Sequence, residues 1–205
     1  QVVEDFWRRE VLQLEASQMR YICGVWGQPS DLLADLRVLI NRRPERIIPE
    51  PEEDGLLAWQ QQFRAHETWL NELKERTRSD IEEVIELIKH SALKRVNNKL
   101  DWLALIRQWA ESPDLTWQMP AKGVKKNLFA EFTQEAVVAE TKAKSASPEH
   151  TYFVFLQRML EAQPSGLKEL FLVQSYYVLN AEFDLHKQQQ KILGFDDLIQ
   201  QVSSA

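Results

Sequence analysis

The stretch that decides the fold is "LLAWQQQFRAHETWLNELKERTRSDIEEVIELIK", residues 56–89. Its apolar residues, together with one histidine and one threonine, mostly recur three or four positions apart, which is the spacing of one helical face. They are Leu56, Trp59, Phe63, His66, Leu70, Leu73, Thr77, Val84 and Ile88. The opposite face carries interleaved acids and bases. The pattern predicts one long helix whose apolar seam needs a partner along its length.

Helical signals also dominate the rest of the chain. A second long helix is predicted from 166 to 193, where Ser165 and Gly166 open it and apolar residues follow along one face. Shorter helices are predicted over 3–23, 30–43 with Ser30 as N-cap, 100–111, 123–138 and 151–162. For 151–162 a strand is the alternative, because the segment starts with aromatic and β-branched residues. The simplest arrangement packs 56–89 antiparallel against 166–193. We therefore expect an all-α fold, a helical bundle with two long antiparallel helices and several shorter ones.

Composition is that of a soluble globular protein, with 205 residues, 44% of them hydrophobic and 27% charged. No run approaches the ~20 apolar residues that a membrane span needs, so no membrane partner is expected. The single cysteine, Cys23, stands among apolar residues and is expected to be a small core residue. One cysteine fits a reducing compartment, and we expect a cytoplasmic protein.

Charge is unevenly distributed along the chain, whose net charge is −6. Two segments, 89–99 and 120–127, hold lysines and arginines with no acid, and such segments are typical of contacts with a polyanion. A solvated basic loop explains the charge alone equally well. The residues expected to contact DNA are Lys89, Lys94, Arg95 and Lys99, then Lys122, Lys125 and Lys126, and in the loop at 141–150 also Lys142 and Lys144.

Chemistry-bearing motifs are weak in this sequence. No G-x-x-x-x-G-K-[ST] phosphate loop occurs, and the four histidines share no metal-ligand spacing. Glu140-Thr-Lys142 reads as E-x-K, the end of one metal-dependent nuclease motif, but such sites need further acids held on strands, and a solvated loop is the preferred interpretation. We expect no catalytic residue, no metal ligand and no cofactor within this chain.

The segment "GFDDL" near the end raises three alternatives: a catalytic carboxylate pair, the start of a helix, or the edge of a larger structure. Gly194 suits the left-handed position that ends the preceding helix, and Asp196 or Asp197 then caps the next one. Phe195 and Leu198 supply apolar side chains. The structural interpretation is favoured because no other acids converge on the pair.

These residues also carry a resemblance. "GFDDLI" after a long polar helix resembles the segment that UvrD-type superfamily 1 helicases carry before their ATP-binding acidic box. The stretches "DFWRREV" and "VWGQPSDLLADLRVLINR" are similar to the RecB family, the beta subunits of exodeoxyribonuclease V. "LDWLALIRQWAE", "QMP", "TKA" and "SPEHTYFVFLQRML" follow in the same order as in that family. The resemblance runs nearly end to end through short motifs.

The resemblance implies that 1–205 is one helical insertion domain, subdomain 1B of the first motor domain, and that 194–205 starts the return into the motor. Members of the family are ATP-dependent 3′–5′ helicases and exonucleases that act in double-strand break repair and recombination with RecC-like and RecD-like companion subunits. ATP, Mg and the nuclease site would belong to the parent protein outside this chain. In the family, an arm from this insertion reaches duplex DNA ahead of the fork, and it corresponds to about 90–102 here, although this stretch is less arginine-rich than the family leads us to expect.

Two functions follow from these observations. The first is a non-catalytic arm that holds the backbone of duplex or forked DNA without sequence preference. Three phosphate contacts, from Lys94, Arg95 and Lys99, would give a log–log salt slope of about −2.7. The alternative is a helical protein-interaction module that docks companion subunits or a regulator.

Overall fold

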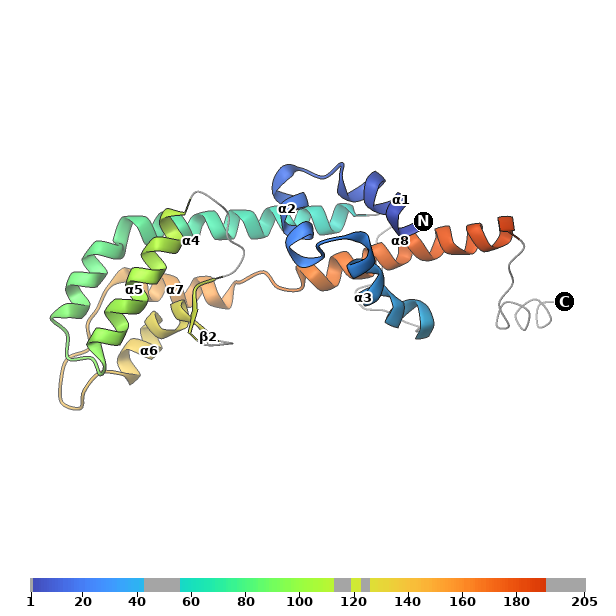
Figure 1. Cartoon of the computed structure of the whole chain (residues 1–205). Coiled ribbons are helices and arrows are strands. Elements are labelled where there is room, and N and C mark those ends of the chain that lie inside the picture. The colour runs from blue at the N-terminus through green and yellow to red at the C-terminus, as the bar shows by residue number, and fades with distance from the viewer. Residues whose placement is uncertain (1, 43–55, 113–118, 123–125, 191–205) are drawn as a thin grey trace. The chain divides into compact units, whose positions relative to one another are not determined.

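Helices form nearly all of the structure, a computed structural model that describes residues 2–42, 56–112, 119–122 and 126–190 (Figure 1). The predicted all-α fold is confirmed. We expected one domain over 1–205, and the chain divides into two compact units. Unit 1 comprises Gln1–Phe63 with Gly166–Ala205, and unit 2 comprises Arg64–Ser165. Helix α4, Leu57–Lys89, begins in unit 1 and continues through unit 2.

Unit 1 has an aromatic core. Its elements are α1 (Val2–Phe6), the π-helix η1 (Trp7–Val11), α2 (Ala16–Val25), α3 (Pro29–Arg42), the first turns of α4, and α8 (Leu167–Gln190). The rings of Trp26 and Trp59 lie 5.3 Å and 5.1 Å from that of Phe171, and all three are buried. Trp59 ties α4 to α8, because its indole Nε1 donates to the carbonyl of Leu167 at 3.0 Å and its backbone N donates to Oε1 of Gln174 at 3.2 Å.

The first segment of unit 1 departs from the predicted helix over 3–23. A turn at 12–15 separates η1 from α2, which restarts with the backbone N of Glu15 donating to Oε1 of Gln18 at 3.3 Å. The predicted N-cap of the next helix was also wrong. Pro29 takes the first helical position of α3, which suits its fixed φ and missing N–H, and Ser30 follows it inside the helix.

Cys23 is exposed, so the prediction of a core cysteine was wrong. The buried residues near it are Gln18, Ile22 and Trp26. Ile22 and Trp26 stand four positions apart on one side of the chain, and Cys23 falls about 100° around the helix from Ile22. Cys23 therefore lies outside the buried face of α2, although its neighbours in sequence are apolar.

Unit 2 packs the remainder of α4 against shorter elements. They are α5 (Val96–Glu111), the hairpin strands β1 (Ala121–Lys122) and β2 (Lys126–Asn127), the 3-10 helix η2 (Leu128–Phe132), α6 (Gln134–Ala139) and α7 (Thr151–Glu161). The core is continuous and includes Leu73, Val84, Ile88, Leu103, Ile106, Phe129, Phe153 and Leu156, each fully buried. In the described part of the helix predicted over 123–138, from residue 126 on, the chain instead forms a strand, a 3-10 helix and a short α-helix in sequence. Asn127 and Thr133 cause the interruptions, because each side chain caps the element that follows it.

Helix α4 has several partners along its length. We expected 56–89 to pack against 166–193 along its length, and the structure pairs α4 with α8 at Trp59, in the part of α4 that belongs to unit 1. Within unit 2, the indole of Trp69 donates to the carbonyl of Met159 at 2.8 Å, and the hydroxyls of Thr77 and Tyr152 are 2.9 Å apart. The ammonium of Lys74 donates to the carbonyl of Ser112 at 3.1 Å. The apolar seam of α4 in unit 2 is therefore covered by α5, η2 and α7.

The helices of the described residues do not meet the requirements of a membrane span. None of them combines the length and the apolar character that crossing a bilayer requires.

Candidate nucleic-acid interface

Two basic loops meet at one end of unit 2. One joins α4 to α5 and the other joins α6 to α7, and both lie beyond the C-terminal end of α4 (Figure 1). Leu93 and Thr141 form an antiparallel β-bridge between them. The backbone N of Lys94 donates to the carbonyl of Glu140 at 2.9 Å, and that of Lys142 donates to the carbonyl of Ala92 at 2.9 Å. We call Lys89, Lys94, Arg95, Lys142 and Lys144 the basic tip.

The side chains of the basic tip face solvent. All five residues are exposed. Lys89 donates to Oε1 of Glu86 at 2.5 Å, and this hydrogen bond is the largest cause of the lowered pKa of Glu86, followed by the charge of Lys89. In the described part of the chain, no carboxylate forms an ion pair with Lys94, Arg95, Lys142 or Lys144. Four positive charges are therefore concentrated where the two loops join.

Backbone strain marks the same place. Arg95 has φ 54° and Lys144 has φ 68°, and they are the described residues other than glycine with positive φ. Arg95 is also the N-cap residue of α5, where its side chain makes no capping hydrogen bond. A left-handed backbone costs a non-glycine residue about 1–2 kcal/mol, and such strain is often found at functional sites. Here the strained residues are two of the four cations of the basic tip for which no ion pair occurs among the described residues.

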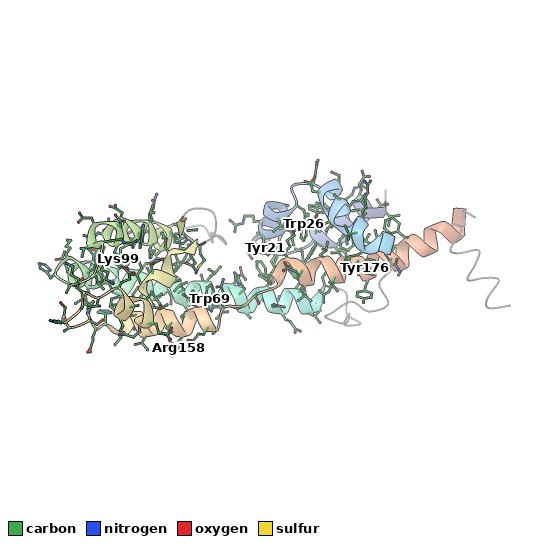
Figure 2. All side chains as sticks on the ribbon, turned by 90° about the horizontal axis from the view of Figure 1, so that it is seen from below. Tyr21, Trp26, Trp69, Lys99, Arg158 and Tyr176 are labelled. Atoms are coloured by element: carbon green, nitrogen blue, oxygen red, sulfur yellow. The ribbon has the colours of Figure 1, made fainter. Side chains whose placement is uncertain are left out.

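Lys99 is not part of this surface, and its prediction as a DNA contact is corrected. It is 1% exposed, on α5 (Figure 2), with its Nζ 3.5 Å from the carbonyl of Glu131. The ammonium also lies over two rings, 5.6 Å from Trp102 and 5.5 Å from Phe132. The reason is the start of α5 at Val96, which aligns Lys99 with the buried Leu103 one turn later.

The other predicted cations are separate from the basic tip in sequence. Lys122 and Lys126 pair across the β1–β2 hairpin through their backbones, and their side chains are not described. Lys125 lies outside the described residues. The segment Gly194, Phe195, Asp196, Asp197 and Leu198 also lies outside them, so its predicted role as a helix start stays a prediction.

Thr141 is the residue of this site that the sequence did not single out as important. Its Oγ1 donates to the carbonyl of Val137 at 2.8 Å and lies 3.3 Å from Oγ of Ser147. These two contacts connect the end of α6 to the loop that joins α6 to α7. In the sequence it was only the middle residue of the E-x-K motif. Among the described residues, no group of three or more potential metal ligands occurs, at Glu140 or elsewhere. No local pattern could have indicated a bridge to Leu93, 48 positions away.

Comparison with known proteins supplies one whole-length match. No protein-family profile matches the chain. The chain is similar to the RecBCD enzyme subunit RecB of Escherichia coli K12, with 26% identity over 210 residues that cover 100% of this chain. It spans 17% of the length of that subunit. The resemblance to RecB predicted from short motifs is confirmed.

Proposed function

We propose, from the similarity of the whole chain to RecB, that it is a helical part of a larger DNA-repair helicase–nuclease and that its basic tip contacts the backbone of duplex DNA. The observation that carries the proposal is the joining of two basic loops by a β-bridge. Two segments that are far apart in sequence thereby present Lys94, Arg95, Lys142 and Lys144 together.

The physical basis is neutralisation of phosphates. Lysine and arginine side chains that contact phosphates release condensed counterions, and this contribution to binding carries no sequence information. The chain as a whole has net charge −6, so its other surfaces repel DNA on average. A local positive site on an acidic protein holds DNA at one place and in one orientation.

The role proposed for this part is positional. ATP and Mg binding, strand separation and DNA cleavage would reside in other parts of a parent subunit of the RecB type, which would act in the cytoplasm with RecC-like and RecD-like companions. The basic tip would hold incoming duplex or forked DNA while the motor advances. The proposal assigns neither ATP hydrolysis nor DNA cleavage to this chain. Its contribution is therefore measured as affinity for DNA.

Fluorescence anisotropy with a labelled forked duplex at low salt tests the proposal. The quadruple variant Lys94→Ala, Arg95→Ala, Lys142→Ala and Lys144→Ala should bind at least tenfold more weakly, since each lost phosphate contact reduces affinity. The matched control removes four exposed cations elsewhere, through Arg8→Ala, Arg20→Ala, Arg37→Ala and Arg64→Ala. It changes net charge equally and should retain most of the affinity.

Three results would contradict the proposal. They are undetectable binding by the unmodified chain, equal losses in the two quadruple variants, and unchanged binding in the variant of the basic tip. Undetectable binding would favour a protein-docking role for these helices. Circular dichroism of both variants checks that they fold.

A further inference from the structure

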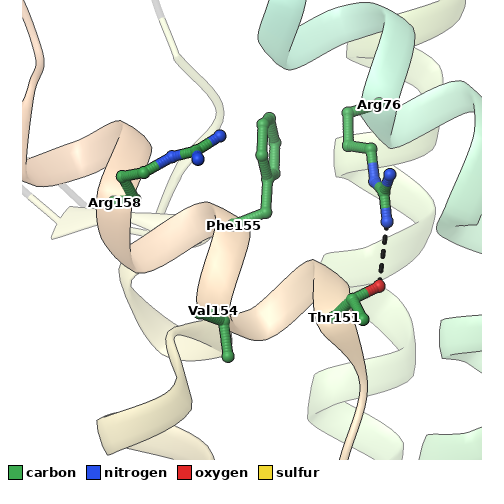
Figure 3. Close-up of a pocket in the computed structure, with 5 residues that line it drawn as sticks. All are labelled: Arg76, Thr151, Val154, Phe155 and Arg158. Carbon is green, nitrogen blue, oxygen red and sulfur yellow. Dashed lines mark hydrogen bonds between the residues drawn. The ribbon is translucent and has the colours of Figure 1, made fainter.

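Unit 2 has a second feature that the DNA contact does not use. A hollow of about 360 Å³ lies beside α7 and is lined by Arg76, Thr151, Val154, Phe155 and Arg158 (Figure 3). Ligand pockets typically measure about 300–1,000 Å³, so this hollow has room for one or two side chains of a ligand. It shares no residue with the basic tip.

The hollow is organised around one aromatic ring. The ring of Phe155 stands between two guanidinium groups, with the Cζ atoms of Arg76 and Arg158 each 5.9 Å from its centroid (Figure 3). Arg76 is held further by Thr151, whose Oγ1 accepts from Nη2 at 2.8 Å, and by Asp80, 2.7 Å from its Nε. The cation–π contact with the ring, the hydrogen bond to Thr151 and the ion pair with Asp80 hold Arg76 in place before any ligand arrives.

Arg158 is held much less firmly. Its side chain is 72% exposed, and its nearest carboxylate, Glu72, is 3.7 Å away, which is longer than a hydrogen bond. An exposed pair of this kind contributes little and is easily exchanged for another anion. Beside it, Val154 is 59% exposed and presents an apolar side chain at the hollow.

The chemistry of the lining selects the ligand. The guanidinium groups of Arg76 and Arg158 flank the ring of Phe155, each 5.9 Å from its centroid. The ring of Tyr152 stacks on that of Phe155 with centroids 6.2 Å apart, so the Phe155 ring offers no free platform on which a nucleobase could stack. What remains is an apolar floor at Val154 and the ring edge, flanked by donors for carboxylates. We propose that this hollow binds an acidic peptide segment of a partner protein, with one apolar side chain against Val154 and Phe155 and carboxylates at the two arginines.

Arginine and aromatic residues are the types that dominate binding energy at protein interfaces, and here Arg76 and Phe155 are already oriented. Glu72 acts as an internal competitor, because it occupies Arg158 when no peptide is bound. This gives the site a distinctive property. Removing the charge of Glu72 should strengthen peptide binding, whereas the loss of an ordinary surface acid has little effect on a contact elsewhere.

The test uses the whole chain and a short fluorescein-labelled synthetic peptide in which aspartates and glutamates flank a central leucine. Arg158→Glu should weaken its binding about tenfold, and Glu72→Gln should strengthen it about twofold to threefold. Val154→Asp places a carboxylate in the hollow at an exposed position, which preserves folding, and should also weaken binding about tenfold. Phe155→Ala removes the floor and should abolish binding.

Two control peptides separate the contribution of the carboxylates to binding from that of the leucine side chain. One replaces each acid by its amide, and the other replaces the leucine by glycine, and both should bind more weakly than the parent peptide. A single-stranded oligonucleotide is titrated against the same variants. The proposal is overturned if the acidic peptide does not bind, if Val154→Asp and Arg158→Glu leave its affinity unchanged, or if these variants lower only the affinity for the oligonucleotide.

Discussion

At the residue scale, Lys99 illustrates that a cation in a basic segment need not reach a ligand. Its ammonium is enclosed by two rings and a backbone carbonyl. Lys99→Met keeps a long unbranched side chain in that enclosure, and we expect DNA affinity within about twofold of the unmodified chain. Lys94→Ala should lower affinity about threefold or more at low salt, since it removes one phosphate contact. Anisotropy titrations compare the two, and a greater loss with Lys99→Met would contradict the placement.

His66 provides a pH dependence of stability. It is 8% exposed and stacks on Trp69 with ring centroids 5.7 Å apart. Burial lowers the pKa of His66 below its ordinary value of 6.5, and a hydrogen bond to the carbonyl of Pro164 opposes this shift less strongly. Below about pH 6.5 the unfolded chain therefore binds the extra proton more readily. Stability should be complete above that pH and fall as the pH decreases, by at most about 1.4 kcal/mol per pH unit.

Urea denaturation between about pH 8 and pH 5.5 measures this effect. His66→Gln, which does not titrate, should lose the part of the slope below about pH 6.5. Parallel profiles for the two proteins would show that His66 does not contribute.

At the scale of elements, Thr141 holds the loop between α6 and α7 in the shape that reaches the other basic loop. Thr141→Val keeps the volume and every charge but removes both hydrogen bonds of Oγ1. The loop should then sample more conformations, and DNA affinity should fall about threefold. The matched control is Thr68→Val, because Oγ1 of Thr68 bonds the carbonyl of Arg64 on α4 in the same manner. Equal affinities of the two variants would contradict the role of Thr141.

Gly166 and Gly24 form a second matched pair of element-scale tests. Gly166 has φ +80°, and its carbonyl accepts from the backbone N of Leu170 at 2.8 Å, at the start of α8. An added Cβ meets no atom within 4 Å at either glycine, so only backbone preference differs. Gly166→Ala should destabilise the chain by about 1–2 kcal/mol, and Gly24→Ala, inside α2, should stabilise it by about 0.5–1 kcal/mol. Urea denaturation measures both, and the same sign for the two changes would contradict this assignment.

At the scale of the whole molecule, the proposed contact is electrostatic and should depend strongly on salt. Four phosphate contacts, from Lys94, Arg95, Lys142 and Lys144, give a log–log slope of about −3.6. Affinity should therefore fall about 150-fold between about 50 mM and about 200 mM salt. Two duplexes of unrelated sequence should bind within about twofold of each other, because phosphates carry no base information. A shallow slope or a strong sequence preference would indicate a different contact.

Much of the architecture could be predicted from the sequence. The long helix was expected over 56–89 and is Leu57–Lys89, and α5 and α7 also occur where periodicity indicated them. Helical periodicity is a local property, so it survives without knowledge of the fold. The missed elements were those that side-chain caps interrupt, around Glu15, Asn127 and Thr133. At a capping residue, the free energies of a capped helix end and of a continuous helix differ by only about 0.5–2 kcal/mol. Tertiary packing therefore decides which of the two forms.

By itself the sequence determined the all-α class, the acid-free basic segment at 89–99 and the resemblance to RecB. Each of these is contained in neighbouring residues. Only the tertiary structure decided that Lys142 and Lys144 join Lys94 and Arg95, that Lys99 turns inward, and that Phe155 lies between two arginines. These features depend on which distant segments meet. That choice is made by burial of the shared core and by backbone hydrogen bonds between loops, and no local pattern of residues encodes it.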